Sequence, residues 1–274
     1  MVTKEDVIIL CEKVNKILDK EPSLLYLDNK FKKILVVGDT HGDYNTTNQI
    51  INKFHKEKYD CMIFLGDYVD RGDKGIQNIN FLLNLKIMEP HRLFLLRGNH
   101  EFPAMNVNYG FFYQVIDYFK EDAEEVYEKY RETFSKLPYA VVYNKILMLH
   151  GGIPVREDGK SYTLEDIAKI PKNIQTIEEL PDIGQQIVWN DPKETIMDDE
   201  LSYRGIGYFF GSNSFNKFMI KNNLEYLIRS HEAFLGGHRL LFNKKLISIF
   251  TCEYYRRGIK IVEIIDNNIN LIDI

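Results

Sequence analysis

Short apolar runs alternate with helical segments over the first hundred residues. Three runs of strand length lie at 34–37, 61–65 and 93–96, and apolar residues recur with helical spacing at 45–54 and 76–85 between them. Strands that alternate with helices predict βαβ units and a parallel sheet. The carboxyl ends of such strands meet at one edge, where open α/β sheets bind their ligands.

The later part of the chain is richer in predicted strands. Apolar runs at 139–142 and 146–149 flank a short polar turn and predict a hairpin. Closing strands are expected at 245–250, 259–265 and 269–272. We find no linker or internal repeat, so we expect residues 1–274 to form one domain.

The N-terminal segment predicts an amphipathic helix that packs on this domain within residues 1–22. Thr3 and Asp6 have the spacing of a helix N-cap, and apolar residues recur at helical spacing from Val7 to Leu18. The segment has no signal-peptide core, and no stretch of the chain approaches the 18 apolar residues of a membrane span. We therefore expect no membrane partner.

Polar clusters follow five of the predicted strands. They read GDTHG at 38–42, GDYVDRG at 66–72, GNHE at 98–101, HGG at 150–152 and HE at 231–232. Taken alone, the second cluster is compatible with a surface turn that carries an Asp-Arg pair. Five strand ends that carry Asp, His or Asn favour a ligand site instead.

In this order, the first four clusters resemble the signature of the phosphoprotein phosphatase family, the metal-dependent protein serine/threonine phosphatases of the calcineurin-like metallophosphoesterase superfamily. The resemblance extends over about residues 34–255. It implies an α/β fold with two mixed β-sheets packed face to face and flanked by helices. It also implies hydrolysis of phosphomonoesters by in-line attack of a hydroxide that two metal ions activate.

The resemblance assigns the site residues to three groups. The expected metal ligands are Asp39, His41, Asp67, Asn99, His150 and His231, with Asp67 bridging the two ions. The expected catalytic residues are His100, Asp70, Arg71 and Arg204. The expected substrate-binding residues are Arg71, Arg204, Asn99 and Tyr255.

Two divalent metal ions are the expected cofactors. Carboxylate, amide and imidazole ligands without a thiolate suit Mn, with Fe, Zn or Mg as alternatives. The resemblance makes His100 the general acid that protonates the leaving alkoxide, held by Asp70. The alternative for His100 is a third ligand on the second metal.

One loop departs from the family pattern. Eukaryotic members typically read SAPNYCG where this chain has TCEYYRR at 251–257. Tyr255 aligns with the family's groove tyrosine, but Arg256 occupies the cysteine position. We expect Arg256 and Arg257 to recruit acidic or phosphorylated peptides.

Charge and cysteine usage narrow the function further. Apolar residues make up 45% of the chain, enough for a two-sheet core, and the formal charge of −5 argues against non-specific nucleic-acid binding. Three cysteines without a C-x-x-C pair predict buried free thiols and a cytoplasmic protein. No arginine follows any of them by six positions, which excludes a cysteine-dependent phosphatase of that type.

The expected partners are phosphorylated protein substrates. We expect the chain to lack the tails and insertions by which some relatives dock regulatory subunits. Two other functions remain open. Diadenosine tetraphosphate hydrolases share the early motifs but usually vary the acidic part of the second, which is intact here. A metal-stabilised phosphopeptide-binding module without turnover would lack a catalytic residue, and none is missing.

Overall fold

Two β-sheets form the centre of the molecule in a computed structural model that describes residues 2–274. The first has five strands in the order β14-β13-β2-β3-β4. The strands are β2 (Lys33–Val37), β3 (Cys61–Phe64), β4 (Leu93–Leu95), β13 (Lys260–Ile265) and β14 (Asn268–Asp273). The pairs β2/β3 and β3/β4 are parallel, as the βαβ pattern predicts, and β13 runs antiparallel to its two neighbours.

The second sheet has six strands in the order β1-β5-β6-β10-β12-β11. They are β1 (Leu24–Tyr26), β5 (Ala140–Tyr143), β6 (Ile146–Leu149), β10 (Tyr226–Arg229), β11 (His238–Leu241) and β12 (Leu246–Ile249). The predicted hairpin is confirmed, because β5 and β6 pair antiparallel with Tyr143 opposite Ile146. The strands β6, β10 and β12 run parallel.

The two sheets pack face to face. Ile34 and Val36 of β2 share a buried core with Ile146 and Met148 of β6. Leu35, between them, points to the opposite face and packs with helices. Because the strands are covered on both faces, they read as continuous apolar runs rather than as alternating patterns.

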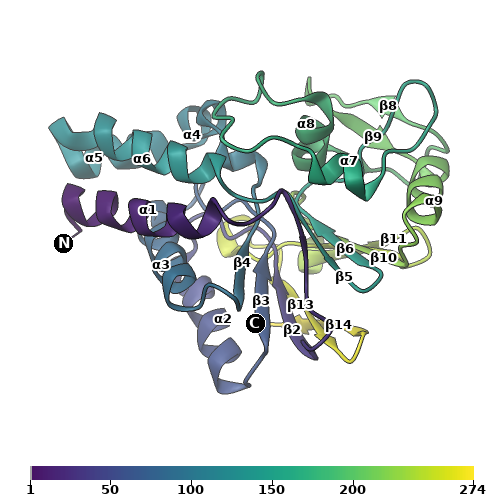
Figure 1. Cartoon of the computed structure of the whole chain (residues 1–274), viewed down its shortest axis with the longest axis horizontal. Helices are drawn as coiled ribbons and strands as arrows, with labels where there is room; N and C mark the ends of the chain where they lie inside the picture. The colour runs from purple at the N-terminus through teal and green to yellow at the C-terminus, as the bar shows by residue number, and fades with distance from the viewer. Residues whose placement is uncertain (1) are drawn as a thin grey trace.

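Helices cover the outer face of each sheet, so the predicted fold class is confirmed (Figure 1). On the five-stranded side lie α1 (Lys4–Leu18), α2 (Tyr44–Lys56), α3 (Gly75–Met88), α4 (Pro103–Tyr109), α5 (Phe111–Phe119) and α6 (Ala123–Ser135). On the other lie α7 (Leu164–Ala168), α8 (Asp182–Trp189) and α9 (Ser212–Lys221). The short 3-10 helices are η1 (Asn99–Glu101), η2 (Lys120–Asp122), η3 (Leu235–Gly237) and η4 (Glu253–Tyr255).

The N-terminal helix α1 lies against α3 and α6. The predicted cap is confirmed, since the Thr3 side chain accepts the Asp6 N–H and the Asp6 carboxylate accepts the Thr3 N–H. At the other end, Lys172 Nζ donates to the carbonyl oxygen of Leu18 at 2.6 Å. The buried Lys86 ammonium pairs with Glu21 just beyond the helix. Both ends of α1 are therefore fixed by specific contacts.

Some elements differ from the sequence expectation. Residues 109–136 carry aromatic and acidic residues at helical spacing, but the chain there is divided at Gly110 and Lys120, where φ is 117° and 53°. A third, small sheet of β7 (Asp191–Pro192), β8 (Glu200–Leu201) and β9 (Tyr208–Phe210) has strands too short to leave a period in the sequence. Within residues 2–274, no helix is both long and apolar enough to cross a bilayer.

Candidate metal centre and catalytic cleft

The carboxyl ends of β2, β3 and β4 meet those of β6 and β10, and the polar clusters follow these strands directly. The six predicted metal ligands come together here, three of them from loops of the five-stranded sheet, one from η1 and two from loops of the six-stranded sheet. They are Asp39, His41, Asp67, Asn99, His150 and His231. Each lies buried or nearly so.

The backbone at this edge is strained. Five residues that are not glycine adopt positive φ, a conformation that L-residues rarely occupy and that clusters at functional sites. They are His41, Asp67, Asp70, Arg71 and His231, with φ between 42° and 72°. The strain turns the side chains inward at positions where the sequence alone shows only polar residues after a strand.

One group of ligand atoms surrounds His150. Its Nδ1 lies 3.0 Å from the carbonyl oxygen of Leu65 and therefore carries the proton. Its Nε2 lone pair then faces Asn99 Oδ1 at 2.9 Å and Asp67 Oδ1 at 3.4 Å. His231 Nδ1 lies 3.1 Å from the same nitrogen. These acceptor atoms converge with no proton between them, and a bound cation would satisfy them.

A second group surrounds His41. Its Nδ1 lies 2.9 Å from the carbonyl oxygen of Val69, so its Nε2 lone pair faces Asp67 Oδ2 at 3.6 Å and Asp39 Oδ2 at 3.8 Å. Within residues 2–274, the buried Asp39 Oδ2 has no hydrogen-bond partner. A buried oxygen without a partner is expected where a cation would bind. Because Asp67 also places one oxygen in each group, the residues fit two cations that share Asp67 as a ligand.

His100 lies beside the second group, next to His41 rather than His150. Its Nε2 is 3.9 Å from Asp67 Oδ2, and its ring meets that of His41 edge to face with centroids 4.7 Å apart. Its Nδ1 lies 2.7 Å from Asp70 Oδ2. Burial lowers the pKa of His100, but the charge of Asp67 and the hydrogen bond to Asp70 outweigh burial, so that the pKa lies above its ordinary value.

Asp70 is held by two further donors. Asn106 Nδ2 donates to Asp70 Oδ2 at 3.0 Å, and the Phe111 N–H donates to Oδ1 at 2.8 Å. The same Asn106 amide also donates to the backbone oxygen of His100 at 2.7 Å. The sequence interpretation missed Asn106, because a lone asparagine in a helical segment carries no signal for this role.

Glu101 is a second residue whose role the sequence did not reveal. Its buried carboxylate accepts the backbone N–H groups of Asp67, Tyr68 and Gly98 at 2.8–2.9 Å. Burial and the neighbouring Asp67 raise the pKa of Glu101 to about 7, although these three donors favour the charged form. The contacts join the loop after β3 to the loop after β4, which fixes Asp67 relative to Asn99.

Tyr109 orients Arg71. The Arg71 guanidinium carbon lies 3.7 Å from the centroid of the Tyr109 ring and 5.9 Å from that of Tyr255. The backbone N–H of Arg71 also donates to the Tyr109 carbonyl oxygen at 3.0 Å. Stacking between aromatic rings fixes the plane of a guanidinium and leaves its donors free. Arg204 is held differently, by an Nε donation to Asp191 Oδ2 at 2.8 Å.

A cleft of about 680 Å³ opens over these groups. Its walls include most of the predicted site residues, while Asp39, Asp70 and His150 lie behind it. The predicted residues that line it are His41, Asp67, Arg71, Asn99, His100, Arg204, His231 and Tyr255. The structure therefore brings all eleven predicted site residues to one place.

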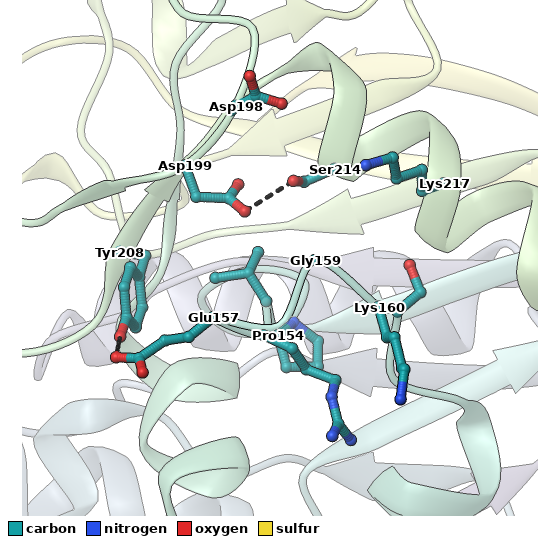
Figure 2. Close-up of a pocket in the computed structure, with 12 residues that line it drawn as sticks. Pro154, Glu157, Gly159, Lys160, Asp198, Asp199, Tyr208, Ser214 and Lys217 are labelled. Atoms are coloured by element: carbon teal, nitrogen blue, oxygen red, sulfur yellow. Dashed lines mark hydrogen bonds between the residues drawn. The ribbon is translucent and has the colours of Figure 1, made fainter.

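A second hollow of about 440 Å³ lies elsewhere, between the loop after β6 and helix α9. Figure 2 shows Asp199 accepting a hydrogen bond from Ser214 and Tyr208 reaching Glu157 across it. Within the described part of the chain, no predicted site residue lines this hollow. The candidate chemistry therefore does not extend to this second hollow.

Comparisons with known proteins agree with this geometry. Residues 32–234 match the family model described as calcineurin-like phosphoesterase. A probable serine/threonine-protein phosphatase of Encephalitozoon cuniculi is 36% identical, covering 81% of this chain and 47% of the relative. The PP2A-like serine/threonine-protein phosphatase PPG1 of Candida albicans is 34% identical, covering 94% and 61%. The chain thus spans about half to three-fifths of the length of these two relatives.

A solved structure gives the same answer for the fold. A protein serine/threonine phosphatase from Saccharomyces cerevisiae with similarity to human PP5 superposes with a TM-score of 0.88 at 27% identity. The match covers 99% of this chain and 90% of that one. The chain therefore belongs to the calcineurin-like phosphoesterase family, and the three relatives described above are named as serine/threonine protein phosphatases.

Proposed function

We propose that this chain hydrolyses phosphoserine and phosphothreonine monoesters in proteins. One observation carries the proposal: the two ligand groups, the His100–Asp70 pair and both arginines meet at a single cleft. Relatives named as serine/threonine protein phosphatases favour a phosphoprotein over other phosphoesters. The three buried free thiols in the described chain suit the reducing cytoplasm, which we propose as the compartment.

Two divalent cations fit the ligand set. Asp39, His41 and Asp67 would hold one, and Asp67, Asn99, His150 and His231 would hold the other. Oxygen and imidazole ligands without a thiolate suit Mn²⁺ first, with Fe, Zn or Mg as alternatives. When bound, such cations supply a water that deprotonates near neutral pH and positive charge opposite the phosphoryl oxygens.

The side chains of the protein supply the remaining steps. Arg71 and Arg204 would bind the phosphoryl oxygens through paired N–H donors, with the Asn99 amide and the Tyr255 hydroxyl beside them. His100 would donate its Nε2 proton to the leaving oxygen of serine or threonine. Asp70 keeps the other ring proton on Nδ1 and stabilises the charged imidazole before transfer.

The test compares two substrates. Metal-stripped protein receives Mn²⁺, Mg²⁺, Zn²⁺ or Fe²⁺ in turn, and hydrolysis of a phosphothreonine peptide is measured beside that of diadenosine tetraphosphate. We expect metal-dependent turnover that favours the peptide, and the Arg71→Ala variant should lose it. Preference for the dinucleotide would contradict the proposed substrate class, and binding of the peptide without turnover under any metal would contradict the proposed activity.

A further inference from the structure

Two neighbouring arginines on the loop between β12 and β13, Arg256 and Arg257, line two different hollows. Arg256 ends the short helix η4 with φ of 51°, a left-handed conformation that turns the chain sharply. Arg257 lines the catalytic cleft of about 680 Å³. Arg256 instead lines a separate hollow of about 290 Å³ together with Lys74 and Asp43. The sequence suggested one role for both, whereas the structure separates them.

Arg257 has donors available within the cleft. Its side chain is exposed, and its Nη1 donates to the carbonyl oxygen of Ala233 at 3.2 Å. Among residues 2–274, no carboxylate lies within 4.0 Å of its guanidinium. A guanidinium carries five N–H donors, so most of them face solvent in the cleft.

Two of the other arginines near Ala233 are already paired with carboxylates. Arg204 pairs with Asp191 at 2.8 Å, and the fully buried Arg229 pairs with Asp191 and Glu232 at 2.8 Å each. Glu232 is the carboxylate of the cleft wall closest in sequence to Ala233, and its charge is offset by Arg229. Arg257 therefore presents uncompensated positive charge on the cleft wall, and Glu232, the neighbour in sequence of its partner Ala233, is already paired with Arg229.

The size of the cleft limits which part of a substrate Arg257 reaches. A volume of 680 Å³ is roughly 11 Å across if taken as a sphere. An extended peptide advances about 3.3 Å per residue, so this span holds about three residues. An arginine on the wall of the cleft therefore meets side chains next to the phosphorylated residue rather than a remote docking motif.

We propose that Arg257 is a specificity residue, which selects substrates with an Asp, a Glu or a second phosphorylated residue within about two positions of the phosphoserine or phosphothreonine. The inference rests on the proposed phosphatase function and names its substrate class. Arg256 takes no part in this selection, because it faces another hollow.

The test uses matched phosphothreonine peptides that carry a single Asp, Asn or Lys at each of three positions on either side. For the unmodified protein, we expect kcat/KM for the best Asp peptide to exceed that for its Asn counterpart about two- to fivefold, the range of an exposed ion pair. Arg257→Ala should reduce this ratio to about one. Arg257→Glu should reverse it in favour of the Lys peptide.

Arg256→Ala is the matched control, since it removes the same charge from the adjacent residue. We expect it to keep the Asp/Asn ratio. The inference is overturned if Arg257→Ala keeps the ratio or if Arg256→Ala abolishes it equally, because the charge of the whole loop would then be responsible. Turnover of the Asn peptides without any Asp preference would overturn the selectivity and leave the phosphatase function standing, whereas no turnover of any peptide would overturn both.

Discussion

Replacing Asp70 by Asn separates the proposed general acid from the rest of the site. The carboxylate of Asp70 is fully buried and lies 2.7 Å from His100 Nδ1. Asparagine keeps the shape and tolerates the left-handed backbone at this position, where φ is 68°. The variant therefore removes the negative charge that stabilises the protonated imidazole, and it replaces one of the two acceptor oxygens with an amide group that cannot accept.

The size of the effect follows from the strength of this contact. A buried hydrogen bond to a charged group contributes about 1.5–3 kcal/mol. If that energy is lost from the step in which His100 donates its proton, hydrolysis slows by a factor of about 10 to 150. The loss applies to a serine or threonine alkoxide, which needs the proton. A p-nitrophenolate leaves without one, so its release should slow less than about threefold.

The assay measures kcat for a phosphothreonine peptide and for p-nitrophenyl phosphate on the same preparations. Asp166→Asn is a matched control, because Asp166 accepts the Thr163 N–H at 2.8 Å in the capping box of α7, which lies with the helices of the six-stranded side. It should alter neither rate by more than about twofold. Equal losses for both substrates in Asp70→Asn, with unchanged metal content and melting temperature, would refute the assignment of His100.

Three further predictions follow from the packing. Tyr109→Ala should lower kcat/KM for phosphopeptides about five- to tenfold, because it removes the ring that orients Arg71. Tyr109→Phe keeps the ring and should lower kcat/KM less than about twofold. Equal losses of kcat/KM in the two variants would contradict a role for the stacked ring. Leu18→Ala should lower the free energy of unfolding in urea by about 3 kcal/mol, because the Leu18 side chain is fully buried. Ile9→Ala on the same helix should lower it by less than about 0.5 kcal/mol, because Ile9 is 49% exposed. Similar losses of stability in the two variants would contradict the docking of α1. Because burial raises the pKa of all three cysteine thiols, native protein at pH 8 should not react with Ellman's reagent, and denatured protein should release three equivalents; rapid reaction of the native protein would contradict the packing.

The strands and the polar clusters could be predicted because both leave local patterns. The runs that became β2, β3 and β6 are apolar throughout, since their faces are covered by helices on one side and by the other sheet on the opposite side. The residues that follow them are the site residues, and their convergence follows from parallel strand order. The predicted roles of these residues remain predictions until they are tested.

Supporting contacts could not be predicted, because they join residues far apart in sequence without a motif. Asn106 reaches Asp70 across 36 positions, and the Tyr109 ring reaches Arg71 across a similar interval. The strand β1 was missed for the same reason: its three residues pair with β5, more than a hundred positions later. The divergence of Arg256 and Arg257 depends on one left-handed residue, which a sequence pattern does not show.

The most direct test of the account is the metal content of the protein and three variants. After loading with Mn²⁺ and removal of excess ion, elemental analysis should find two ions per chain. His231→Ala should retain one ion and Asp39→Ala should retain one, because each removes a ligand from one group. Asp67→Ala should retain none, because Asp67 places one oxygen in each group. One ion or none in the unmodified chain, or an Asp67→Ala variant that keeps as much metal as His231→Ala, would contradict a centre of two cations built on Asp67.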